Sequence, residues 1–116
     1  MPLYAALLYT HDGDWSSPEE AEMTREFAEF TAWAGDAIQG GAALRPTSTA
    51  TTVRVSGGKG GDLTVTDGPF AEAKEVLGGF FMLEAADLDA AVKLAERIPV
   101  AWDGGVELRP VLPQHV

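Results

Sequence analysis

Few side chains in this chain of 116 residues are placed to carry out chemistry. An imidazole and a carboxylate, His11 and Asp67, each follow a stretch with strand character, and a carboxylate that orients an imidazole raises its basicity. Such a pair would suit proton transfer, so both residues are catalytic candidates. For His11 the alternative is simple titration on the surface. Asp67 is the stronger candidate because stiff turn residues surround it.

The turn at Asp67-Gly68-Pro69-Phe70 stops regular structure for three separate reasons. Aspartate bonds backbone amides ahead of it, glycine accepts positive φ, and proline fixes φ and lacks a donor. One interpretation is a ligand site lined by Asp67 and Phe70. The other is a structural corner in which Asp67 caps residues 72–74 and Phe70 lies in the core. The side chains that we predict to bind a ligand are Tyr4, Arg54, Phe70, Lys74 and Phe80.

The composition predicts neither a metal centre nor a cofactor. The chain has no cysteine, and its two histidines, His11 and His115, form no HxH or HExxH pattern. The glycine-rich stretch 56–62 lacks the spacing of a phosphate-binding loop, and no helix follows it. We interpret it as the loop of a hairpin between strands 51–55 and 63–66.

Hydrophobic periodicity predicts the remaining elements. Ser17 and Glu20 have capping-box spacing, with Pro18 at the first helical position, and Gly35 ends that helix. Asp87 stands where an N-cap belongs, ahead of an apolar stripe of Leu88, Ala91, Ala95 and Ile98 with Val92 beside it. The expected strands are 3–9, 37–44, 51–55, 63–66, 80–83 and 104–111, and the expected helices are 18–34 and 88–98.

A short internal repeat supports one fold for the whole chain. The sequence GGAALRP at 40–46 recurs as GGVELRP at 104–110, with five of seven positions identical. Each copy follows an expected helix, so the chain consists of two strand-helix-strand halves with an inserted hairpin. This arrangement predicts a single α+β domain over residues 1–116, a ferredoxin-like sandwich with both helices on one face of an antiparallel sheet.

Two expected strands are apolar at successive positions, at residues 4–8 and 80–83. Because successive strand residues point to opposite faces, one covered face cannot bury both sets. Leaving the other face wet would expose more apolar surface than monomers tolerate. We therefore predict a homodimer packed sheet to sheet, with Phe80 or Phe81 near the centre of its interface.

The net charge of −10 limits the partners that the protein can bind. Seven carboxylates and a single arginine lie within residues 12–29, and such a field repels phosphate backbones, so we expect no direct nucleic-acid binding. The acidic stretch is interpreted as a solvated helix face. No apolar run approaches the ~20 residues of a membrane helix, and the first residues do not resemble a signal peptide. A cytoplasmic location is the expectation.

The stretch at 66–99, TDGPFAEAKEVLGGFFMLEAADLDAAVKLAERIP, together with GGVELRPV at 104–111, resembles the DGPF branch of the YCII-related family over nearly the whole chain. The resemblance implies a dimeric α/β barrel. It also implies a regulatory association, since DGPF-type proteins resemble partners of extracytoplasmic-function sigma factors. In enzymatic relatives a histidine of the first helix pairs with an aspartate. Residues 19–30 contain no histidine, so His11 does not take that role.

Two functions remain open at this point. The first is a non-catalytic homodimeric module that binds a small molecule or acts as a regulatory accessory. The alternative is a cofactor-free enzyme that uses Asp67 for proton transfer, elimination or isomerisation on a small aromatic or lactone-like substrate. The absence of the family's histidine favours the first.

Overall fold

A computed structural model describes residues 1–15, 17–71 and 73–113. Its strands and helices follow the predicted order, and short 3-10 helices join several of them. The elements are β1 (Leu3–Thr10), α1 (Ala21–Ala34), β2 (Ile38–Ala43), β3 (Thr51–Ser56), β4 (Asp62–Asp67), β5 (Val76–Glu84), α2 (Leu88–Ala95) and β6 (Gly105–Pro110), with 3-10 helices at Pro18–Glu20, Gly35–Ala37, Thr47–Thr49 and Pro99–Trp102.

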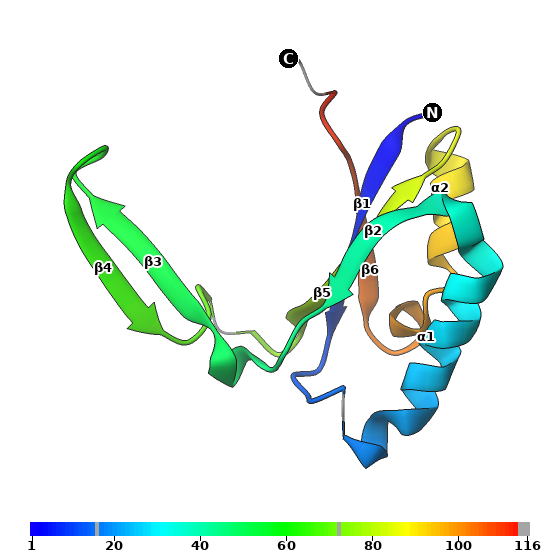
Figure 1. Ribbon diagram of the computed structural model, residues 1–116, viewed down its shortest axis with the longest axis horizontal. Coiled ribbons are helices and arrows are strands. Elements are labelled where there is room, and N and C mark those ends of the chain that lie inside the picture. The colour runs from blue at the N-terminus through cyan, green and yellow to red at the C-terminus, as the bar shows by residue number, and fades with distance from the viewer. Residues whose placement is uncertain (16, 72, 114–116) are drawn as a thin grey trace.

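Four of the strands form an antiparallel sheet in the order β2-β5-β1-β6. Both helices lie on one side of this sheet (Figure 1). The predicted α+β class is confirmed, and the arrangement is compatible with a ferredoxin-like fold. The two copies of the seven-residue repeat contribute β2 and β6, the two edge strands.

The sheet face beneath the helices forms the core of the domain. Along β1 the buried residues alternate with half-buried ones, and Tyr4, Ala6 and Leu8 face the helices. Ala6 pairs with Phe81 of β5, and Tyr4 pairs with Leu83, so these side chains share the covered face. Phe30 of α1 and Ala91 and Ala95 of α2 close over them, as do Ile98 and Val100.

The opposite face of the same strands is apolar and has no helix over it. Ala5 pairs with Met82, and Leu7 pairs with Phe80, and all four are only partly buried. Of the two phenylalanines predicted near the dimer centre, Phe80 therefore lies on this open sheet face. Phe81 instead packs against Phe30 in the core, with ring centroids 5.3 Å apart.

The start of the first helix differs from the prediction. Pro18 does open a helical turn, but it is a 3-10 turn, and α1 begins at Ala21. The Ser17 side chain makes no capping hydrogen bond, so the predicted capping box is wrong. The carboxylate of Glu20 lies 3.2 Å from Nε2 of His11 instead. A tertiary partner has thus replaced the local one.

The second helix keeps its predicted cap but is shorter than predicted. The Asp87 carboxylate accepts a hydrogen bond of 2.8 Å from the N–H of Ala90. The helix ends at Ala95, and Ile98 is fully buried in the turn that follows. Leu88 and Val92 are about half exposed. The helix packs on the sheet through the small residues Ala91 and Ala95, so the side that carries Leu88 and Val92 faces outward.

Strands β3 and β4 form a hairpin of their own, and they pair only with each other. The hairpin projects from the sheet on the side away from the helices (Figure 1). Apart from the partly buried Thr52, its strand residues are exposed. The predicted hairpin is confirmed, and its loop contains Gly57, Gly58 and Gly60 at positive φ.

The cap of α2 provides a test of the local energetics. Asp87→Ala removes the acceptor for the N–H of Ala90, and it should lower the free energy of unfolding by about 1 kcal/mol. Ser17→Ala is the matched control, because the Ser17 side chain caps nothing, and it should change stability by less than ~0.5 kcal/mol. Urea denaturation followed by circular dichroism measures both. Equal losses in the two variants would contradict the assigned caps.

Candidate functional site

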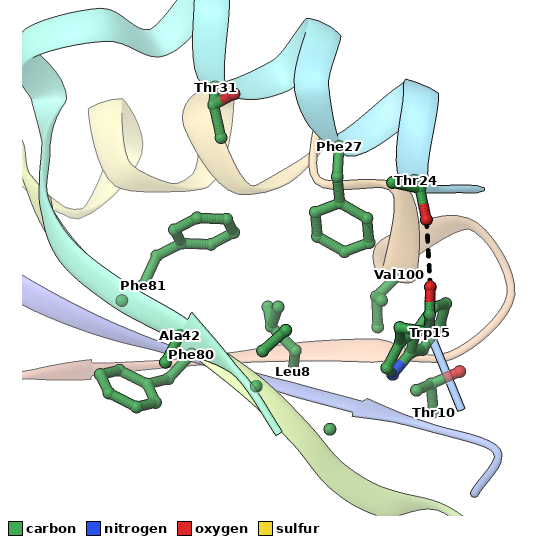
Figure 2. A pocket seen from close by; sticks show the side chains of 14 residues that line it. Leu8, Thr10, Trp15, Thr24, Phe27, Thr31, Ala42, Phe80, Phe81 and Val100 are labelled. Atoms are coloured by element: carbon green, nitrogen blue, oxygen red, sulfur yellow. Dashed lines mark hydrogen bonds between the residues drawn. The ribbon is translucent and has the colours of Figure 1, made fainter. Parts of the chain in front are cut away.

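A pocket of about 370 Å³ lies between α1 and the β2–β5 side of the sheet. Figure 2 shows Phe27 of α1 pointing toward the sheet, with Trp15 at one end and Phe81 at the other. Side chains from the loop after β1 and from Val100 complete the wall. The lining residues are Leu8, Thr10, Trp15, Thr24, Phe27, Thr31, Gly41, Ala42, Ala43, Gly78, Gly79, Phe80, Phe81 and Val100.

The space exists because two successive residues of β5, Gly78 and Gly79, have no side chains. A Cβ atom placed on Gly78 would lie 3.3 Å from the Thr10 methyl group and 3.6 Å from the indole nitrogen of Trp15. A Cβ atom on Gly79 would lie 2.8 Å from the carbonyl oxygen of Ala42. The glycine pair therefore lets β2 lie close to β5 and leaves open space at the base of the pocket.

Aromatic rings form most of the remaining wall. The ring centroids of Trp15 and Phe27 are 6.2 Å apart with the rings nearly perpendicular, and those of Phe27 and Phe81 are 6.3 Å apart. Phe30 continues the series into the core beside Phe81. Tilted and edge-on pairs at these distances each contribute about 0.5–1.5 kcal/mol beyond area burial. The rings therefore stabilise one another, and they present faces and edges to the cavity.

The polar groups of the pocket are few, and most are already engaged. The Thr24 hydroxyl donates to the carbonyl oxygens of Glu20 (3.0 Å) and Trp15 (3.3 Å), and the Thr31 hydroxyl donates to that of Ala28 (2.9 Å). The indole N–H of Trp15 makes no hydrogen bond within the described part of the chain, and it lies beside Gly78. No described residue of the lining is titratable. The site is thus apolar with one available donor.

The loop that carries Trp15 is tied down at several points. His11 lies next to Trp15, with ring centroids 5.8 Å apart, and its Nε2 is 3.2 Å from the Glu20 carboxylate. Its Nδ1 is 3.3 Å from the Thr10 hydroxyl. This exposed histidine therefore supports the mouth of the pocket, and its partner is Glu20 and not Asp67.

Asp12 fastens the same loop to the segment that follows β2. Its carboxylate accepts hydrogen bonds from the Thr47 hydroxyl and from the Thr47 backbone N–H, the latter at 3.0 Å. The pKa of Asp12 is lowered mainly by the hydrogen bond from the Thr47 hydroxyl. The bond from the Thr47 backbone N–H lowers it further, and the neighbouring His11 does so more weakly. Hydrogen bonds to a carboxylate favour its charged form.

The predicted site residues around the turn lie outside this pocket. Asp67 ends β4 on the projecting hairpin, is exposed, and its carboxylate makes no hydrogen bond to a described residue. Phe70 is 72% exposed, so its placement in the core is wrong. The Arg54 guanidinium lies 4.4 Å from the centre of its ring. Glu72, part of the proposed cap, is outside the described residues.

Gly68 meets the requirement that the turn chemistry predicted. It has φ of 104°, a conformation that side chains disfavour, and its carbonyl oxygen accepts a 2.8 Å hydrogen bond from the Thr52 hydroxyl. Its own N–H donates to the carbonyl oxygen of Ala50. The structure thus brings Arg54 and Phe70 together at the base of the hairpin.

The other predicted ligand contacts are scattered. Tyr4 is buried in the core at 7% exposure, and Lys74 is exposed in the segment before β5. Only Phe80, among the predicted residues, lines the pocket. The residues that sequence reasoning missed are Trp15, Phe27 and Gly78. A lone tryptophan in a loop and a Gly-Gly pair inside an apolar strand were the available signals.

No three described residues of the types His, Asp and Glu gather into a group that would hold a metal ion. Within the described ranges no helix is both long and apolar enough to cross a bilayer. The candidate site is the pocket between α1 and the sheet of this α+β domain.

Comparison with known proteins places this domain in a family. The model of the YCII-related domain matches residues 3–115. An uncharacterised protein of Rhizobium meliloti (strain 1021) is 36% identical over 116 residues, which cover 94% of this chain and 91% of the relative. The chain belongs to the YCII-related family. The predicted association with sigma factors stays a prediction.

The Asp12–Thr47 contact predicts a pH effect. Thr47→Val removes the hydroxyl donor but keeps the backbone N–H, so the pKa of Asp12 should rise part of the way toward its ordinary value. A lowered carboxyl pKa stabilises the fold above the ordinary range of aspartate, and this contribution is lost as the pH falls through about 4 and below. Carboxylate NMR titration measures the shift.

Thr49→Val is the control for that titration, because the Thr49 hydroxyl donates to the carbonyl oxygen of Pro46 in the same short helix. It should leave the titration of Asp12 unchanged. An identical Asp12 titration in the Thr47→Val protein and the wild type would show that the hydroxyl bond does not form in solution.

Proposed function

We propose that this protein is a binding module for a small, flat, uncharged ligand, which occupies the pocket between α1 and the sheet. The observation that carries the proposal is the combination of aromatic walls with a glycine floor and one unengaged donor. A volume of about 370 Å³ falls at the lower end of the range of ~300–1,000 Å³ that is usual for ligand pockets.

The chemistry of the lining supports a particular class of ligand. Rings that meet a cavity with both faces and edges favour a planar aromatic or unsaturated guest. The indole N–H of Trp15 would pair with one acceptor, such as a phenol or lactone oxygen. No cation lines the wall to pair with a carboxylate, and burying an unpaired charge is costly.

Binding is better supported than catalysis by the placement of the titratable groups. Proton transfer requires a base within hydrogen-bond reach of the substrate. Asp67 is on the hairpin, outside the pocket, and the imidazole of His11 is separated from the cavity by Trp15 and paired with Glu20. The turn Asp67-Gly68-Pro69-Phe70 supports membership of the DGPF branch of the family.

The proposal includes a homodimer packed through the open sheet face, which would be a dimeric α/β barrel. Its support is the apolar surface over β1 and β5, where Leu7, Phe80 and Met82 lie without a helix to cover them. Phe80 also borders the ligand pocket. Its ring lies on the other side of the strand from Phe27 (Figure 2), so dimerisation would bury the ring and hold the strand beneath the pocket.

Gly78→Val tests the binding site, with 2-naphthol as the probe. The valine side chain would grow toward Thr10 and Trp15 and fill the floor, so it should weaken 2-naphthol binding at least about tenfold in titration calorimetry. Gly105→Val is the matched control in a strand, because a Cβ atom there meets nothing within 4 Å. It should bind 2-naphthol as the wild type does.

Two outcomes would count against the proposed site. One is that wild-type protein gives no saturable heat with 2-naphthol up to its solubility limit. The other is that Gly78→Val and Gly105→Val bind the probe equally.

Met82→Asp tests the sheet-to-sheet dimer. A carboxylate in the middle of the open face would have to lose its water in the interface, so the variant should sediment as a monomer at concentrations where the wild type is dimeric. Leu88→Asp, at an exposed leucine on α2, changes the charge equally and should stay dimeric. A wild-type monomer at tens of micromolar refutes the dimer.

A further inference from the structure

The hairpin of β3 and β4 carries an apolar face that no described part of the chain covers. Val53 pairs with Val65, and Val55 pairs with Leu63, so the four side chains share one face. They are between 49% and 65% exposed. We call this set the aliphatic hairpin face. A contiguous patch of this kind on a monomer is commonly a functional surface.

The opposite face of the hairpin is different in character. Thr52, Arg54, Thr64 and Thr66 point to that side, as the pairing of Thr52 with Thr66 and of Arg54 with Thr64 requires. Arg54 reaches Phe70, and Thr52 bonds the carbonyl oxygen of Gly68. The hairpin is thus amphipathic, with its polar side tied to the turn and its aliphatic side free.

An isolated two-stranded hairpin is marginally stable in water, and an uncovered strand edge invites pairing with other chains. Strand residues that alternate valine and leucine on one side are typical of a hairpin that packs on a surface. The chain's own sheet does not supply that surface, since the hairpin projects away from it (Figure 1). Any cover for this face would therefore come from another molecule.

Charge favours a second copy of this chain as that molecule. Two chains that each carry −10 repel one another, so they associate best through surfaces free of net charge. In residues 51–67, Arg54 and Lys59 balance Asp62 and Asp67. The open sheet face is nearly neutral: β1 carries no charge, Glu107 of β6 pairs with Arg109 at 3.2 Å, and Glu84 at the end of β5 is left unbalanced.

The area required for a stable dimer points to the same occupant. Strand spacing and rise give the open face of a four-stranded sheet a footprint of roughly 400–500 Å². A stable interface buries ~800 Å² per partner, so the sheet contact alone is small. A hairpin of this length adds roughly 200 Å² per arm and covers a similar area on its partner, which brings the interface into the stable range.

We propose that the β3–β4 hairpin is a dimerisation arm, whose aliphatic hairpin face packs on the second copy of the chain that is seated against the open sheet face. The inference rests on the proposed homodimer and adds an exchange of arms to it. Each arm packs on the partner, so two-fold symmetry gives two identical arm contacts in the dimer.

Single cysteines test the arm directly, because the native chain contains none. Leu63→Cys lies on the aliphatic hairpin face, and Thr64→Cys is its neighbour on the other side. The rate of alkylation by N-ethylmaleimide is measured as protein concentration rises through the dimerisation range found by sedimentation. We expect Cys at 63 to react at least about tenfold more slowly in the dimer, and Cys at 64 to slow by less than about twofold.

Lysine substitutions give a second readout. Val53→Lys with Val65→Lys should raise the dimer dissociation constant at least about tenfold, whereas Thr64→Lys with Thr66→Lys, which changes the net charge equally, should leave it within about twofold. A wild-type dimer in which Leu63→Cys reacts at one rate at all concentrations overturns the arm while the sheet contact stands. Protection that requires a different protein overturns it too. A wild-type monomer refutes the arm and the dimer together, whereas binding of 2-naphthol is decided independently.

Discussion

The two central strands of this domain are apolar on both faces of the sheet. Both helices, however, cover the same face. Burial of Ala6, Leu8 and Leu83 beneath the helices creates the core. The alternation of strand side chains then necessarily turns Leu7, Phe80 and Met82 to the other side. One sheet therefore has a stable covered face and an unsatisfied open face. The interior of the domain, the pocket at its edge and the proposed association with a second copy all follow from this one-sided cover.

The pocket arises where that cover is incomplete. At the β2 edge, glycines in β5 replace the side chains that would otherwise fill the gap beneath α1. The loop after β1 then supplies Trp15, and Thr24 and Glu20 hold this loop against the first helical segments. The pocket opens to the surface, so it is a hollow beneath α1 and not a void in the core. Its aromatic walls are the basis of the proposal that a small ligand occupies it.

The polar and titratable side chains predicted to carry out chemistry lie outside the cavity. Asp67 and Arg54 lie on the hairpin, and His11 serves as a support for the loop that holds Trp15. An apolar site with one donor can select a molecule by shape and by a single acceptor, and its described lining contains no titratable side chain. The first helix of this YCII-related chain contains no histidine, so it adds no imidazole to the cavity.

Local sequence determined the elements and their order. The Asp87 cap, the Gly68 turn, the hairpin and the α+β class were all predictable, because each depends on residues within a few positions of one another or on hydrophobic periodicity. The surplus of apolar residues also predicted an open face, although it did not tell Phe80 from Phe81.

Tertiary structure decided the rest. It paired Glu20 with His11 in place of Ser17, exposed Phe70, and assembled the pocket from Trp15, Phe27 and Gly78, which lie far apart in the chain. Such contacts depend on strand register and on how closely a helix approaches a sheet, and short-range spacing carries no information about either.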